Sequence, residues 1–177
     1  MRTAIFVPMW TLVGTGPRWP ERSSVEALGL DHIDLTVSDL KGSAEFYELV
    51  LGALGFSRVE HPTYTAWSNG RMNIGLRQAS PEYGAAGVDR FRPGLHHLAL
   101  RAKSRSDVDE FHGLLVERGL PVLDPPAEYP EYGPSYYAVF FADPDAMKLE
   151  LVHFPWGYWR RVQTEGHDGR PRYQLQR

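Results

Sequence analysis

The sequence predicts an α+β fold in which two tandem βαβββ modules form a cup-shaped mixed sheet with the helices on its outer face. One observation is an internal repeat: residues 30–35 (LDHIDL) return as residues 94–100 (GLHHLAL), and Glu45-Phe46 recurs at the same offset as Glu110-Phe111. A second is the spacing of the apolar residues in each copy, which alternates as in a strand, then follows the spacing of a helix, and then alternates again. A third is that 177 residues, 42% of them hydrophobic, suffice for two fused modules with a core.

The repeat divides the chain into five parts. We expect an N-terminal extension over 1–28, a first module over 29–78, a Gly- and Pro-rich linker over 79–93, a second module over 94–154 and a C-terminal tail over 155–177. The extension is either a flexible arm or a strap on a partner subunit. The tail is aromatic, and we expect it to pack on the body or on a second subunit.

The first module begins with the alternating segment 32–37, which predicts a strand. Cap-type residues follow, and apolar residues at helical spacing predict a helix over 41–53, which Gly55 ends. Three further strands are expected over 58–60, 64–67 and 72–77, the last two joined by a turn at Asn69-Gly70.

The second module repeats this order. The pattern predicts a strand over 97–102, a helix over 106–118 ended by Gly119, and strands over 122–123, 136–142 and 148–153. An additional Pro-rich loop is expected over 125–134. It is either a lid or binding loop, or a loop without a role in the site.

Composition excludes several classes of function. A net charge of −3 without any Lys/Arg block argues against nucleic-acid or membrane partners. No apolar run is long enough for a membrane span, and no signal peptide is recognised, so we expect a cytoplasmic protein. Because cysteine is absent, any metal must be bound by His, Asp or Glu.

Three residues are candidate metal ligands. His32 and His97 occupy equivalent repeat positions, and Glu150 lies on the face of its strand opposite Leu149 and Leu151. Two imidazoles and one carboxylate form a site with open positions, typical of Fe²⁺, Mn²⁺ or Zn²⁺. Two alternatives stay open: Lys148 could pair with Glu150, and the histidines could serve only the seam between the modules.

Other residues are candidates for substrate contacts. Asn73 and Arg77 lie two residues on either side of Gly75, so all three are expected on the same face of their strand. Arg77 either binds an anionic substrate group or forms an ion pair. Trp67 is expected either in the core or in the wall of the site, where it would contact the substrate. Tyr132 and Tyr137, near the long loop, are the candidates for proton transfer.

The chain resembles the vicinal oxygen chelate superfamily, which includes glyoxalase I, extradiol dioxygenases, fosfomycin-modifying enzymes and bleomycin-binding proteins. The resemblance rests on the segments 31–47 (DHIDLTVSDL, then Ser43 and Phe46-Tyr47) and 141–151 (FADPDAMKLEL). It implies paired modules around a divalent metal, with ligand positions at His32, Gly75, His97 and Glu150.

Because Gly75 has no side-chain donor, the ligand pattern is similar to that of extradiol dioxygenases and fosfomycin enzymes rather than that of glyoxalase I. The resemblance implies a metal-dependent dioxygenase, lyase or isomerase, in a homodimer, whose small substrate chelates the metal through vicinal oxygens. The alternative is a non-catalytic protein that binds or sequesters a small molecule.

Overall fold

The computed structural model describes residues 27, 29–59, 64–84 and 87–155. By its contacts the chain divides after Leu30, and every described helix and strand follows that point. Apart from Ala27 and Pro155, the predicted N-terminal extension and C-terminal tail lie outside the described residues. No helix among the described residues has the length and apolar character that crossing a membrane requires.

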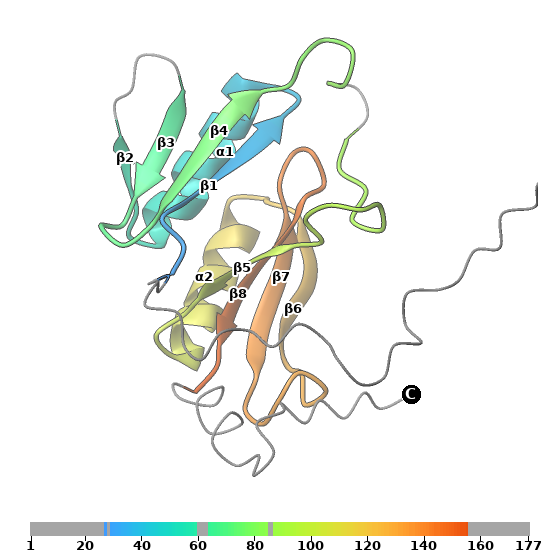
Figure 1. The fold of residues 1–177 in the computed structure, drawn as a ribbon. Coiled ribbons are helices and arrows are strands. Elements are labelled where there is room, and N and C mark those ends of the chain that lie inside the picture. Colours follow the sequence, from blue (N-terminus) through green and yellow to red (C-terminus); the bar gives the residue numbers. More distant parts are fainter. Residues whose placement is uncertain (1–26, 28, 60–63, 85–86, 156–177) are drawn as a thin grey trace, which may run out of the picture. The chain divides into compact units, whose positions relative to one another are not determined.

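The first module consists of five elements in the predicted order (Figure 1). They are β1 (His32–Val37), α1 (Leu40–Ala53), β2 (Ser57–Val59), β3 (Thr65–Ser68) and β4 (Asn73–Gln78). The sheet has the order β1-β4-β3-β2, in which β1 runs parallel to β4 and the other neighbours are antiparallel.

The second module repeats this topology, so the predicted fold class is confirmed. Its elements are β5 (Leu98–Arg101), α2 (Arg105–Glu117), β6 (Val122–Glu128), β7 (Tyr137–Ala142) and β8 (Lys148–His153). The order β5-β8-β7-β6 again places the first strand parallel to the last.

Local signals in the sequence explain where the two helices begin and end. Asp39 caps α1 by accepting a hydrogen bond from the backbone N–H of Lys41. Ser104 and Asp107 form a capping box at the start of α2. Gly55 and Gly119, with φ of 80° and 63°, let the chain turn away after each helix in a conformation that other residues rarely adopt.

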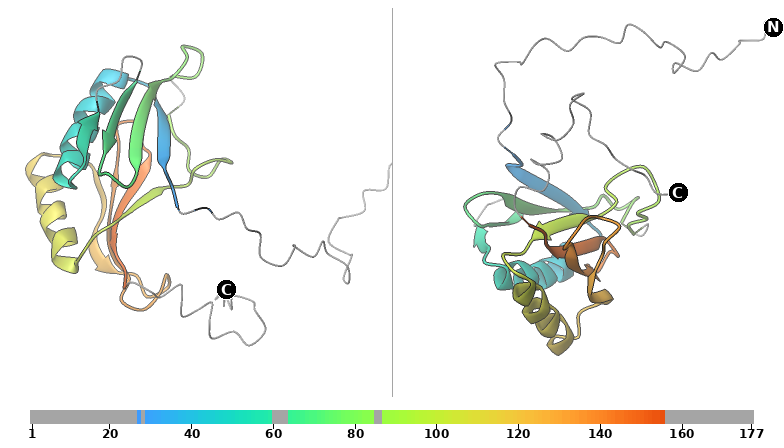
Figure 2. Two further views of the ribbon diagram at one scale, coloured as in Figure 1. Left: turned by 60° about the vertical axis from the view of Figure 1, so that its left-hand side comes forward. Right: turned by 90° about the horizontal axis from the view of Figure 1, so that it is seen from below.

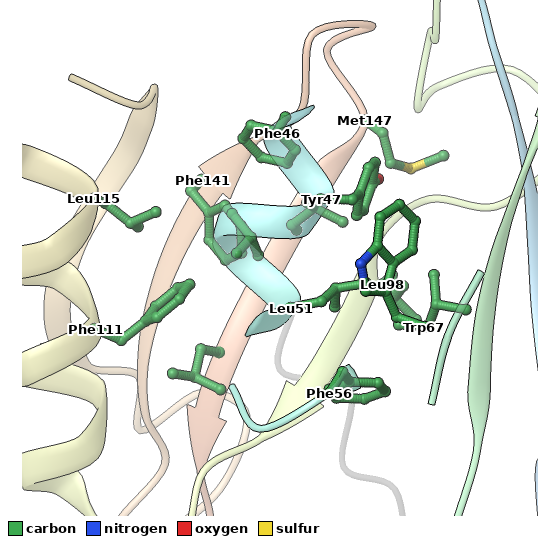
Figure 3. Packing of buried hydrophobic residues seen from close by; sticks show 14 of the residues in the cluster. Phe46, Tyr47, Leu51, Phe56, Trp67, Leu98, Phe111, Leu115, Phe141 and Met147 are labelled. Atoms are coloured by element: carbon green, nitrogen blue, oxygen red, sulfur yellow. The ribbon is translucent and has the colours of Figure 1, made fainter. Parts of the chain in front are cut away.

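Each helix covers one face of its own sheet (Figure 2). The buried side chains on these faces form one hydrophobic cluster with members from both modules. Phe46 and Tyr47 of α1, Phe111 of α2 and Phe141 of β7 are among its large members (Figure 3). We refer to the opposite side of each sheet as its helix-free face.

The turn between β7 and β8 also joins the modules by hydrogen bonds. The Tyr47 hydroxyl donates to Oδ2 of the buried Asp143 at 2.9 Å, and the Ser38 amide donates to Oδ2 of Asp145 at 2.8 Å. Burial raises the pKa of Asp143, although the amide of Met147 and the hydroxyl of Tyr47 oppose this by bonding to the carboxylate.

The long loop of the second module is shorter than predicted. Residues 125–128 belong to β6, so the connection to β7 begins at Tyr129. Pro125 and Pro126 are accommodated because β6 is an edge strand and its pairing with β7 shifts register between Asp124 and Ala127. The expectation of a loop over 125–128 was therefore wrong.

Candidate functional site

The helix-free face of the second module carries a buried carboxylate. Along β8, Leu149 and Leu151 enter the hydrophobic cluster, so Glu150 lies on the opposite face. It is paired with Ala99 of β5 on one side and with Phe140 of β7 on the other. Its side chain is only 1% exposed.

Two side chains bind Glu150. The imidazole Nε2 of His97 lies 3.2 Å from Oε2, and the hydroxyl of Tyr136 donates a short hydrogen bond to Oε1. Burial raises the pKa of Glu150, while Tyr136 and then Lys148 act in the opposite direction. Burial lowers the pKa of His97, with smaller contributions from the cations Lys148 and Arg90. The imidazole is therefore biased toward its neutral form, which is the form that can bind a metal.

Lys148 does not form the ion pair that would occupy Glu150. Its ammonium group lies 3.6 Å from the centre of the Phe140 ring, in a cation–π arrangement. Among the described residues, no ion pair joins Lys148 to Glu150, and the only salt-bridge contact of this carboxylate is with His97.

A group of packed aromatic side chains lies beside Glu150 through Tyr136 and Phe140, and we call this group the aromatic floor. Neighbouring rings lie 5.1 Å apart for Tyr129 and Phe140 and 5.3 Å apart for Tyr136 and Phe154. The aromatic floor consists of Tyr129, Tyr132, Tyr136, Phe140 and Phe154. The second module therefore presents packed aromatic rings next to one buried carboxylate on its helix-free face.

The two predicted catalytic tyrosines occupy different places. Tyr137 lies on the helix side, where its hydroxyl donates to Asp109 at 2.6 Å and the Arg105 guanidinium lies over its ring. Tyr132 belongs to the aromatic floor, is 52% exposed and stacks with Tyr129. The structure brings neither hydroxyl to Glu150.

Tyr136 is the functional candidate that the sequence analysis missed. Strand alternation could have indicated it, since Val139 and Phe141 face the core and residues of even number therefore face Glu150.

His32 is not joined to the other two predicted ligands within one chain. Its Nδ1 lies 2.9 Å from Oδ2 of Asp31, and its side chain is 62% exposed. The hydrogen bond to Asp31 raises the pKa of His32. Across the described ranges 29–59, 64–84 and 87–155, no three His, Cys, Asp or Glu side chains are grouped closely enough to hold a metal.

The helix-free face of the first module carries a different arrangement. Asp34 of β1 is paired in register with Gly75 of β4, and the Arg77 Nε–H donates to Oδ2 of Asp34 at 2.6 Å. The Arg77 guanidinium also lies 5.3 Å from the ring centre of Tyr64. Arg77 therefore forms the ion pair that was one of its two predicted roles.

Trp67 is a core residue and not a wall of the site. Its ring is completely buried, and its indole N–H donates to Glu48 of α1 at 2.7 Å, on the helix side of β3. Asn73, the other predicted substrate contact, is half-buried at the start of β4 and is paired in register with His32.

Comparisons with known proteins agree with this architecture. Residues 29–151 match the family described as the Glyoxalase/Bleomycin resistance protein/Dioxygenase superfamily. The uncharacterised protein YqjT of Bacillus subtilis is 35% identical over 124 residues, which cover 70% of this chain and 97% of YqjT.

Two further relatives are informative. A 2-epi-5-epi-valiolone epimerase from an Actinomyces species is 29% identical over 163 residues, covering 78% of this chain and 86% of the epimerase. A crystal structure of a protein from Bacillus halodurans has 33% identity and a TM-score of 0.61, covering 71% of this chain and 95% of that one.

Proposed function

The chain belongs to the Glyoxalase/Bleomycin resistance protein/Dioxygenase superfamily, and on that premise we propose that it is a metal-dependent enzyme of the isomerase type. Its substrate is a small molecule with two neighbouring oxygens, one of them a carbonyl, and the reaction moves a proton at the adjacent carbon. The epimerase relative, matched over 86% of its length, supports this reaction type over a dioxygenase.

Glu150 is the observation on which the proposal depends. A carboxylate that is 1% exposed is costly to hold ionised unless a cation compensates it. The described residues offer His97, which burial biases toward neutrality, the uncharged Tyr136, and the cation Lys148, whose ammonium lies over the Phe140 ring and lowers the Glu150 pKa less than Tyr136 does. A divalent ion bound by His97 Nε2 and a Glu150 oxygen would supply the missing charge, and this donor set fits Fe²⁺, Mn²⁺ or Zn²⁺.

The third ligand in this proposal is His32 from a second copy of the chain. His32 is exposed on the first module, whereas His97 and Glu150 form a two-donor site on the second, and one chain does not group the three. A homodimer in which the modules are exchanged between copies would bring one His32 to each His97–Glu150 pair.

The neighbouring residues have supporting roles. Tyr136 fixes the Glu150 carboxylate by its hydrogen bond, as outer-shell partners of metal ligands do. The aromatic floor keeps water from the carboxylate and offers ring faces to the substrate. The bound ion would act as a Lewis acid on the two substrate oxygens and so lower the energy of proton removal.

Complementation between two inactive variants tests the proposal. His32→Gln and Glu150→Gln chains, each expected to lose metal, are co-refolded, and the mixed dimer is isolated by two affinity tags. Metal content is then measured by elemental analysis. Exchanged ligands predict one metal ion per mixed dimer, because one site recovers all three ligands and the other loses two. Ligands from a single chain predict none.

The reaction type is tested separately with the metal-loaded wild type. A panel of α-hydroxyketones is incubated in D₂O, and deuterium at the carbon beside the carbonyl is measured by mass spectrometry. Oxygen consumption would contradict an isomerase. Purified protein that neither contains nor takes up metal would support the alternative, a non-catalytic small-molecule binding protein.

A further inference from the structure

The two modules place their carboxylates on opposite members of the same strand pair. In the second module, Glu150 is on the last strand and its register partner on the first strand is Ala99. In the first module, the last strand carries Gly75 and its register partner on the first strand is Asp34. The acidic and the small residue are thus exchanged between the paired strands.

Asp34 occupies the space that a side chain at position 75 would need. A Cβ built on Gly75 would lie 2.3 Å from Oδ1 of Asp34, which is far shorter than any ordinary contact. Gly75 therefore makes room for a carboxylate that reaches over it from the neighbouring strand. Both modules present an acidic group near the same point of the sheet, but from different strands.

The charge of Asp34 is already compensated, unlike that of Glu150. Arg77 donates to it at 2.6 Å through Nε, and Tyr64 supports the guanidinium from one side. This contact uses only the Nε–H of the guanidinium group. Its two Nη groups donate no hydrogen bond to any of the described residues, and its side chain remains 53% exposed.

We infer that Arg77, oriented by Asp34 and Tyr64, binds an oxyanion of the substrate, either a carboxylate or a phosphate group. The two free Nη groups match the two oxygens of such a group. Asp34 lies two residues from His32 on the same face of β1, a separation of about 7 Å along a strand. The inference rests on the proposed function for the remainder of the substrate: oxygens that chelate at the His32 end and an anionic group at the Arg77 end.

The test measures anion binding in the absence of metal. Inorganic phosphate and malonate are titrated separately into metal-free protein. Affinity is measured by isothermal titration calorimetry, and the site is identified by the NMR resonances of the arginine Nε–H groups. Arg77→Gln assigns the Arg77 resonance and serves as the loss-of-site variant. Arg58→Gln is the matched control, because Arg58 also pairs with a carboxylate, Glu48, and lies over an aromatic ring, Trp67, and is similarly exposed.

We expect at least one anion to shift the Arg77 resonance saturably. Affinity should fall about tenfold or more in Arg77→Gln and stay unchanged in Arg58→Gln, since a charge-assisted hydrogen-bond pair is lost only in the first. The preferred anion distinguishes a carboxylate from a phosphate substrate. Equal anion affinity in Arg77→Gln and the wild type, or equal losses in both variants, would overturn the inference.

Gly75→Ala is the second variant, because its methyl group forces the Asp34 carboxylate, which bonds Arg77, to shift without removing either charge. We expect its Arg77 Nε–H resonance to move away from the position typical of a carboxylate-bonded group and its anion affinity to change. An unchanged resonance and affinity would contradict the orienting role of Asp34. Metal content is measured in every variant: anion binding without metal uptake would overturn the proposed function alone, and metal uptake without anion binding would overturn only this inference.

Discussion

The helix-free faces of the two modules are built on the same topology but use their carboxylates differently. Glu150 is 1% exposed, and its partners are an imidazole biased toward neutrality and a phenol. Asp34 is 30% exposed and is bound to a guanidinium. A shared position on a repeated sheet therefore does not fix a shared role, because the cation beside the carboxylate decides whether it is available to a ligand.

The largest expected effect distinguishes these two carboxylates. Glu150→Gln should weaken divalent-metal binding by more than about hundredfold, since changes to outer-shell partners alone cost about 10–100-fold. Asp34→Asn, made at the corresponding point of the first module, should leave metal affinity within a few fold. Isothermal titration with Zn²⁺ and Mn²⁺ measures both. Equal losses in the two variants would mean that the faces are not functionally different.

A second prediction concerns the core under the two faces. Trp67 and Phe141 hold corresponding places, paired in register with Ile74 and Leu149. Trp67→Phe makes the modules alike there but removes ring volume and the hydrogen bond to Glu48. We expect the free energy of unfolding to fall by about 2 kcal/mol, measured by urea denaturation, with metal affinity unchanged. A loss of metal affinity at unchanged stability would show that Trp67 contributes to the metal site.

A third prediction concerns the turns that precede the last strands. In the first module, Asn69 Oδ1 accepts from the amides of Arg71 and Met72, and in the second, Asp143 Oδ1 accepts from those of Asp145 and Met147. Because burial raises the pKa of Asp143, the folded state keeps this proton to higher pH than the unfolded chain does.

The wild type should therefore lose stability from this group as the pH rises from about 4, the ordinary value for Asp, through the raised pKa. In Asp143→Asn this loss should be absent, so the stability difference between variant and wild type should shift in favour of the variant over that interval. Unfolding free energies at a series of pH values measure it. A difference that does not vary with pH would contradict the assignment.

The smallest expected effect is in the same turn. Ala146 has φ of 65°, whereas the turn of the first module uses Gly70 at φ of 77°. Ala146→Gly relieves about 1–2 kcal/mol of backbone strain but increases the freedom of the unfolded chain by about 0.4–1 kcal/mol. We expect a gain of stability below about 1 kcal/mol, seen as a small rise in Tm. A clear loss would show that the Ala146 methyl group contributes more by packing than its conformation costs.

The repeated elements were well predicted because they depend on local patterns. The helix expected over 41–53 is Leu40–Ala53, and the strands expected over 32–37 and 148–153 have those bounds. The same alternation correctly placed Glu150 opposite the core. Strand alternation would also have separated Tyr136 from Tyr137, but nearness to the long loop was used instead, and this criterion carries no information about faces.

Other features depend on contacts between distant segments, which periodicity does not encode. The hydrogen bond between Tyr47 and Asp143 follows from how the modules pack. The position of the Asp34 carboxylate over Gly75 depends on the register in which β1 pairs with β4. Repeat equivalence paired His32 with His97, but equivalence within a sequence does not determine whether two side chains meet in one chain or across two.

The edge strand β6 has one further consequence, for self-association. Pro125 and Pro126 have no amide hydrogen, so the middle of this edge strand is short of the backbone donors that an added strand from another molecule would require. Uncontrolled strand addition and fibril growth are thereby hindered at the outer margin of the second sheet.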